Sequence, residues 1–148
     1  MKISVRGRYA LAAMMHMSVN YERGEYLTVI SISERLGISK IYLEQVFSQL
    51  KRGGLIDSIK GAKGGYKLAR APRRITAEDI LLIVEPAIFE EPQGTAPEKA
   101  PEIDKAMRLC VFRVIDDKIR EALRSITLDN LVLEAEKLKA DDSIMFFI

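Results

Sequence analysis

The sequence is poor in the residues that build disulfides, metal sites and hydrolytic active sites. Its 148 residues include one cysteine, one histidine and no tryptophan. A single cysteine excludes a disulfide within one chain and fits a reducing compartment. Cys110 and His16 both lie in apolar stripes at helical spacing, whereas catalysis needs a nucleophile with a base, a carboxylate pair or a metal set. We therefore expect neither an enzyme nor a bound metal or cofactor.

Long apolar runs are absent as well. No stretch approaches the roughly 20 residues that a membrane-spanning helix needs. The N-terminal segment has basic residues before an apolar stretch, as a signal peptide does, but His16 and Ser18 interrupt it and no A-x-A cleavage site follows. We interpret it as the first helix of a mature cytoplasmic protein that makes no membrane contact.

The formal net charge of +2 conceals an asymmetry between the two halves of the chain. Residues 1–75 carry 14 Lys or Arg and 5 Asp or Glu, and residues 76–148 carry 9 and 16. Such an asymmetry indicates a nucleic-acid partner for the basic half. A basic half without that role is equally common, so charge alone does not decide between them.

Two short helices joined by a tight turn are predicted in residues 28–52. Thr28 is a suitable N-cap for the first helix, and Gly37 ends it. Ser39 can cap the second helix, whose apolar residues recur at i, i+3, i+4 and i+7. That buried stripe consists of Leu43, Val46, Phe47 and Leu50.

Two apolar-rich runs follow, Leu55–Ile59 and Tyr66–Ala69, joined by the glycine-rich loop KGAKGG. This pattern predicts a β-hairpin. Two helices joined by a tight turn and followed by a hairpin form a winged helix-turn-helix. We assign residues 1–85 to this DNA-binding domain, with a first helix over Val5–Val19 and a last helix opened by Thr76.

The rest of the chain is predicted to be helical after a loop. Residues 86–101 are rich in proline and glutamate and are predicted to form a loop. Residues 102–148 form a dimerisation helix to about Ser125 and a C-terminal helix from Thr127 to about Lys139. The predicted fold class is mainly α with a small β-hairpin. The dimer interface is predicted to contain Ile103, Met107, Cys110, Val111, Val114 and Ile119.

The second helix of such a motif enters the major groove of DNA with its N-terminal residues at the bases. With the apolar stripe inward, the outward positions include Lys40, Tyr42, Glu44 and Gln45. Gln45 can bond the adenine edge and Glu44 can accept from cytosine N4. Ser39, at the N-terminus of this helix, suits a phosphate. The alternative is that these are merely solvated residues on an exposed helix.

The hairpin loop is the second candidate contact. Gly61 allows a close approach to a groove, and Lys60 and Lys63 can contact phosphates or the minor groove. A nucleotide-binding loop is the rival interpretation, but the pattern G-x-x-x-x-G-K-[ST] is absent. We add Arg6 and Thr28 to the predicted DNA contacts.

The segments MKISVRGRYAL, LGISKIYLEQVFSQLKRGGLI, IKGAKGGYKLA and ITAEDILLIVE closely resemble the Rrf-type family of bacterial winged-helix regulators. The resemblance implies a dimeric repressor or activator. It implies base contacts at the positions matching Ser39, Tyr42, Glu44 and Gln45, and a minor-groove contact at Lys60-Gly61. Members of the family commonly have arginine where this chain has Lys60, which lacks the planar guanidinium fork.

Cluster-sensing members of the family place three cysteines, often with a histidine, before the long helix. The resemblance puts Ala106 and Leu109 at two of these positions, so we predict a cluster-independent regulator. Its signal could be a small-molecule effector, a regulatory protein partner as for the family's cysteine-metabolism repressor, or oxidation of Cys110. For Cys110 we favour a buried role at the dimer interface over redox sensing. The alternatives for the function are a winged helix that binds protein instead of DNA and a redox-sensing regulator that acts through Cys110.

Overall fold

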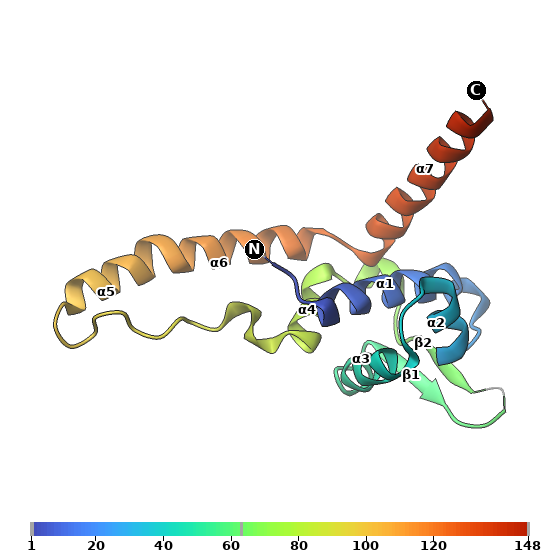
Figure 1. Cartoon of the computed structure of the whole chain (residues 1–148), viewed down its shortest axis with the longest axis horizontal. Coiled ribbons are helices and arrows are strands. Elements are labelled where there is room, and N and C mark those ends of the chain that lie inside the picture. Colours follow the sequence, from blue (N-terminus) through green and yellow to red (C-terminus); the bar gives the residue numbers. More distant parts are fainter. Residues whose placement is uncertain (1, 63, 148) are drawn as a thin grey trace.

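The computed structural model describes residues 2–62 and 64–147 (Figure 1). A winged-helix body occupies one side of the molecule, and two helical projections leave it. The elements, in chain order, are α1 (Val5–Val19), η1 (Tyr21–Arg23), α2 (Val29–Leu36), α3 (Lys40–Arg52), β1 (Ile56–Ile59), β2 (Gly65–Leu68), η2 (Pro72–Arg74), α4 (Ala77–Val84), η3 (Pro86–Phe89), α5 (Pro101–Met107), the π-helical turn η4 (Arg108–Phe112), α6 (Arg113–Ser125) and α7 (Leu128–Phe147). The predicted fold class, mainly helical with one hairpin, is confirmed.

The main core lies between α1, α3 and α4, with the hairpin closing one edge. The whole predicted stripe of α3 is buried, with Leu43, Phe47 and Leu50 at 0% exposure and Val46 at 1%. Met14 of α1 and Ile80 of α4 complete the same cluster. Because the inner face of α3 is buried in this core, its other face points outward.

Local hydrogen bonds fix the turn between α2 and α3. Thr28 Oγ1 accepts from the N–H of Ser31, and Ser39 Oγ accepts from the N–H of Tyr42. Gly37 takes φ 67°, the left-handed conformation that glycine adopts without steric cost. Ser33 Oγ donates to the carbonyl of Ile38 and closes the turn. Both predicted caps are therefore confirmed.

The hairpin is antiparallel, with Ile56 paired to Leu68 and Ile59 to Gly65. The residue before Thr28 extends it, because Leu27 and Tyr66 exchange two backbone hydrogen bonds of 2.8 Å. This approach requires glycine at position 65, where a Cβ would lie 2.2 Å from the Leu27 carbonyl oxygen. The base of the wing is thus joined to the start of α2.

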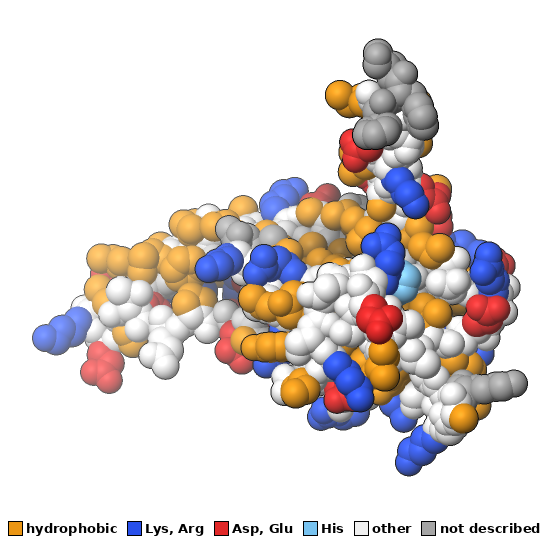
Figure 2. All heavy atoms as spheres, turned by 45° about the vertical axis from the view of Figure 1, so that its right-hand side comes forward, with side chains coloured by type: hydrophobic (Ala, Val, Ile, Leu, Met, Phe, Trp, Pro, Cys, Tyr) orange, Lys and Arg blue, Asp and Glu red, His pale blue; other side chains and the backbone are white. Residues whose placement is uncertain are grey.

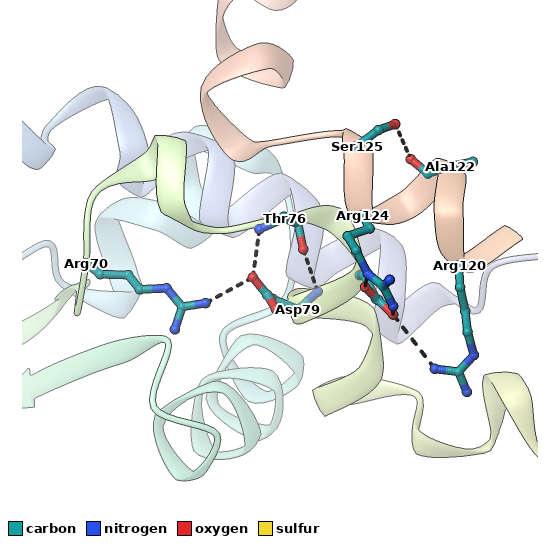
Figure 3. Close-up of polar contacts among 8 residues, drawn as sticks. Arg70, Thr76, Asp79, Arg120, Ala122, Arg124 and Ser125 are labelled. Atoms are coloured by element: carbon teal, nitrogen blue, oxygen red, sulfur yellow. Dashed lines mark hydrogen bonds and ion pairs between the residues drawn. The ribbon is translucent and has the colours of Figure 1, made fainter. Parts of the chain in front are cut away.

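The capping box predicted at the start of α4 is present, since Thr76 and Asp79 exchange hydrogen bonds. Arg70 also donates to Asp79 at 2.9 Å (Figure 3). These contacts fix the N-terminus of α4 beside the chain that leaves the hairpin.

Residues 90–100 lead away from the body, and the helices α5, η4 and α6 run back beside them as one long arm (Figure 1). Asp104 holds the two together by accepting from the N–H groups of Thr95 and Ala96. Arg108 pairs with Glu91 and adds a second link between the same two segments.

The last helix, α7, projects away from the body toward the C-terminus (Figure 1). It continues to Phe147, so the predicted end near Lys139 is wrong. Among the described residues, no helix is long and apolar enough to span a membrane.

Candidate DNA interface

The outward face of α3 carries the predicted base-reading residues. Lys40, Tyr42, Glu44 and Gln45 are all exposed, and Tyr42 keeps 54% of its surface accessible. Ser39 is exposed at the start of the helix, with its hydroxyl oxygen bound to the Tyr42 N–H. The structure therefore brings these five positions onto one free surface over the first two turns of α3.

Two contacts organise that surface. Lys40 Nζ lies 3.7 Å from Glu44 Oε1, an i,i+4 ion pair in which both side chains stay about half exposed. Such a pair holds the Glu44 carboxylate beside a cation, which offsets its repulsion from phosphates. Tyr9 of α1 meets Tyr42 edge to face, with ring centroids 5.8 Å apart. Tyr9 therefore limits the orientations of Tyr42.

Arg6 reaches the same surface from α1. One open depression is lined by Arg6, Tyr42 and Gln45 together with Glu85 and Ile88. Glu85 anchors the entry to α1 by accepting from the backbone N–H and hydroxyl of Ser4. The basic N-terminal segment thus lies beside the N-terminal half of α3.

The wing extends the surface beyond α3. Lys60 and Gly61 are exposed at the hairpin end, and Gly61 has φ 113°. Lys63, also predicted to contact DNA, lies outside the described residues. Figure 2 shows Lys and Arg side chains along the lower edge of the winged-helix body, the level at which α3 and the hairpin lie in Figure 1.

Thr28 lies on the exposed surface as expected, and Tyr9 is an addition to the predicted surface. The hydroxyl oxygen of Thr28 accepts from the N–H of Ser31, and its hydroxyl hydrogen can still donate to a phosphate. Tyr9 was not predicted as part of the surface. No local sequence signal identifies it, because its neighbour Tyr42 is two helices away and only the tertiary fold brings them together.

The predicted dimer residues fall into two groups on the arm. Ile103, Val111 and Val114 are exposed to 55%, 46% and 50%, and Cys110 is exposed too. Met107 and Ile119 are half-buried. Ile119 packs within its own chain against a second core cluster, formed by Ala77, Leu81 and Leu123.

The ligand set does not suit an iron–sulfur cluster, which needs several thiolates. Cys110 is the only cysteine of the chain. The described residues contain no group of three His, Cys, Asp or Glu side chains placed to hold a metal ion.

His16 is half-buried on α1, where burial and then the charge of Arg35 lower its pKa.

A helix-turn-helix with an exposed second helix, a glycine-rich wing and a helical arm defines a winged-helix transcriptional regulator. The comparisons agree, because the family model Rrf2, described as an iron-dependent transcriptional regulator, matches residues 3–134. The chain belongs to the Rrf2 family.

Named relatives and solved structures support the assignment. The chain is 33% identical to the HTH-type transcriptional regulator IscR of Pectobacterium carotovorum, over 96% of this chain and 85% of that protein. It is similar to the structure of IscR from T. potens, with a TM-score of 0.73, 32% identity and coverage of 93% and 90%. It is equally similar to CymR, described as the global cysteine regulator of B. subtilis, with a TM-score of 0.73, 34% identity and coverage of 90% and 98%. These relatives are bacterial regulators, a non-enzymatic class, as expected for this chain.

Proposed function

We propose that this chain is a sequence-specific repressor that binds a near-palindromic operator as a homodimer, without an iron–sulfur cluster. The observation that carries the proposal is the free outward face of α3 beside the wing. Tyr42, Glu44 and Gln45 lie there with no core role, while the opposite face of the same helix is fully buried.

The proposed contacts divide into two kinds. Glu44 and Gln45 read base edges in the major groove, since their side chains match cytosine N4 and the adenine edge. Arg6, Lys40 and the wing residues Lys60 and Gly61 hold the phosphates or the minor groove, which gives affinity but little sequence information.

Dimerisation is proposed to occur through the arm. Ile103, Val111, Val114 and Ile115 leave apolar side chains about half exposed there. Burial of apolar surface stabilises by roughly 25 cal/mol per Å², so a second arm packed on this face would be strongly favoured. A two-fold dimer places two recognition helices about one DNA turn apart.

The proposed signal is a small-molecule effector or a regulatory protein. The likeness to CymR, a global cysteine regulator, directs the first search to metabolites of cysteine and sulfur. We infer a cytoplasmic location from the same function, because the operator lies on the chromosome.

Gln45→Ala tests base readout by α3. We expect it to relax the base preference at one position in each half-site, with about 1–3 kcal/mol of discrimination lost there. Gln49→Ala, one turn further along the same helix, is the matched control and should leave the preference intact. Binding of a library of single-base operator variants measures both. Equal weakening on every sequence would make Gln45 a backbone contact and contradict the assignment.

Val114→Lys tests the arm as the dimer interface. A lysine in a packed apolar contact should produce a monomer in sedimentation at micromolar concentration and abolish tight operator binding. Leu133→Lys, on the equally exposed α7, is the control and should remain dimeric. A wild-type protein that sediments as a monomer would refute the dimer itself.

A further inference from the structure

A buried carboxylate links the proposed dimerisation arm to the winged-helix body. Glu78, near the start of α4, is only 7% exposed. Arg124 of α6 donates to both of its oxygens, with Nε 2.8 Å from Oε2 and Nη2 3.2 Å from Oε1. Arg120, one turn earlier on α6, places Nη1 3.7 Å from Oε1. Figure 3 shows Arg120 and Arg124 both leaving α6 on the side that faces α4.

The other contacts between the arm and α4 lie close to the α6–α7 corner. The α6–α7 corner is joined to the start of α4 by two backbone hydrogen bonds, from Ala77 N to Ile126 O and from Leu128 N to Ile75 O, both 2.8 Å. These bonds fix the position of the corner, but both lie beyond the C-terminal end of α6 and do not contact the rest of that helix. The small cluster of Ala77, Leu81 and Leu123 is apolar, and the hydrophobic attraction that holds it is non-directional. The two-point guanidinium contact does set an angle, because its geometry is planar and fixed.

Arg120 adds a second constraint on the same rotation. Its guanidinium lies over the Phe89 ring, 4.0 Å from the centroid, while it also faces Glu78. Phe89 belongs to η3, directly after α4. The arm therefore contacts both ends of the α4–η3 segment, through Glu78 at the start of α4 and Phe89 at the end of η3.

The opposite side of α4 contacts the recognition helix. Ile83 packs directly on Gly53, the residue that follows α3, since a Cβ at Gly53 would lie 2.3 Å from Ile83 Cδ1. A rotation of α4 relative to α6 would therefore move the end of α3. Because α4 has only eight residues, its two contact faces move as one body.

We propose that Glu78 is a positioning residue that sets the distance and angle between the two recognition helices of the dimer, and so determines which half-site spacing is accepted. This inference rests on the proposed function. Glu78 touches no DNA; it acts through Arg124 and Arg120 on the arm, and through α4 on α3.

The test compares operators in which the spacer between half-sites is one base pair shorter, unchanged or one base pair longer. One base pair rotates a half-site by roughly 35° about the DNA axis, which a rigid dimer cannot follow. We expect wild type to prefer one spacing sharply. In Glu78→Gln the ratio of affinities between the preferred and the shifted operators should fall by about fivefold, or roughly 1 kcal/mol.

Glu121→Gln is the matched control. Glu121 lies on α6, the helix that carries Arg120 and Arg124, and among the described residues its ion pair is with Lys118, at 3.2 Å on the exposed side, so its loss should keep the wild-type spacing ratio. If Glu78→Gln does not fold, Arg124→Gln replaces it, because the Arg124 side chain is 66% exposed and its loss leaves Arg120 beside Glu78.

The outcomes separate the two proposals. A folded dimer of either variant with an unchanged spacing ratio overturns the inference, whether or not all operators are bound more weakly. A wild-type protein that binds no operator overturns the proposed function instead.

Discussion

Gly65→Ala should partly detach the wing from the helix-turn-helix. An alanine Cβ would lie 2.2 Å from the Leu27 carbonyl oxygen and 2.5 Å from its carbon, both backbone atoms that cannot rotate away. Moving them apart sacrifices the two hydrogen bonds between Leu27 and Tyr66, worth about 0.5–1.5 kcal/mol each. It also loosens the contact between the Phe47 and Tyr66 rings, whose centroids are 4.7 Å apart. We expect a loss of about 2–4 kcal/mol in the free energy of unfolding.

Equilibrium unfolding in urea, at one fixed protein concentration, measures this loss. Gly37→Ala is the control. Gly37 has φ 67°, and an alanine Cβ at this position would meet no atom within 4 Å, so only the backbone penalty of about 1–2 kcal/mol applies there. If Gly65→Ala is no more destabilised than Gly37→Ala, the close approach of Leu27 does not anchor the wing.

Two further predictions concern the core and the arm. Phe47→Ala empties the centre of the main core, where Phe47 is 0% exposed, and should cost about 3–5 kcal/mol in urea unfolding; a loss below about 1 kcal/mol would contradict the packing. Hydrogen bonds from the N–H of Thr95, and then from that of Ala96, lower the pKa of Asp104 in the folded protein. The ionised Asp104 therefore stabilises the fold fully above its pKa in the unfolded chain, and this stabilisation is lost as the pH falls through its pKa in the folded protein. The difference in unfolding free energy between wild type and Asp104→Asn should therefore be constant above about pH 5 and shrink below about pH 4; a constant difference at acid pH would refute the contact.

The elements that sequence reasoning predicted well are those specified within one or two turns of chain. The stripe of α3 and the caps at Thr28, Ser39 and Thr76 depend on residues three or four apart, and all four features are present. The exposed face of α3 could be predicted as well, because burial of the apolar stripe leaves the other residues of the helix pointing outward.

The features that sequence reasoning missed depend on tertiary contacts. Leu27 pairs with Tyr66, and Glu78 with Arg124, across long stretches of chain that have no shared periodicity. The π-helical turn at Arg108–Phe112 carries no composition signal, yet it shifts the apolar stripe along the arm. Within α6 itself, Val114 and Ile119 are five residues apart and so lie on different faces of the helix: Ile119 packs against its own α4 while Val114 remains exposed.

The central claim is that the outward face of α3 and the wing bind duplex DNA of a particular sequence. Selection of a site from random duplex, followed by titration of the selected and a shuffled duplex over a range of salt, tests it most directly. We predict a preference of about 10³ or more for the selected site. The logarithm of the binding constant should fall linearly with the logarithm of salt concentration. A selection that returns no motif, with an affinity independent of salt, would contradict the account and favour a protein-binding winged helix.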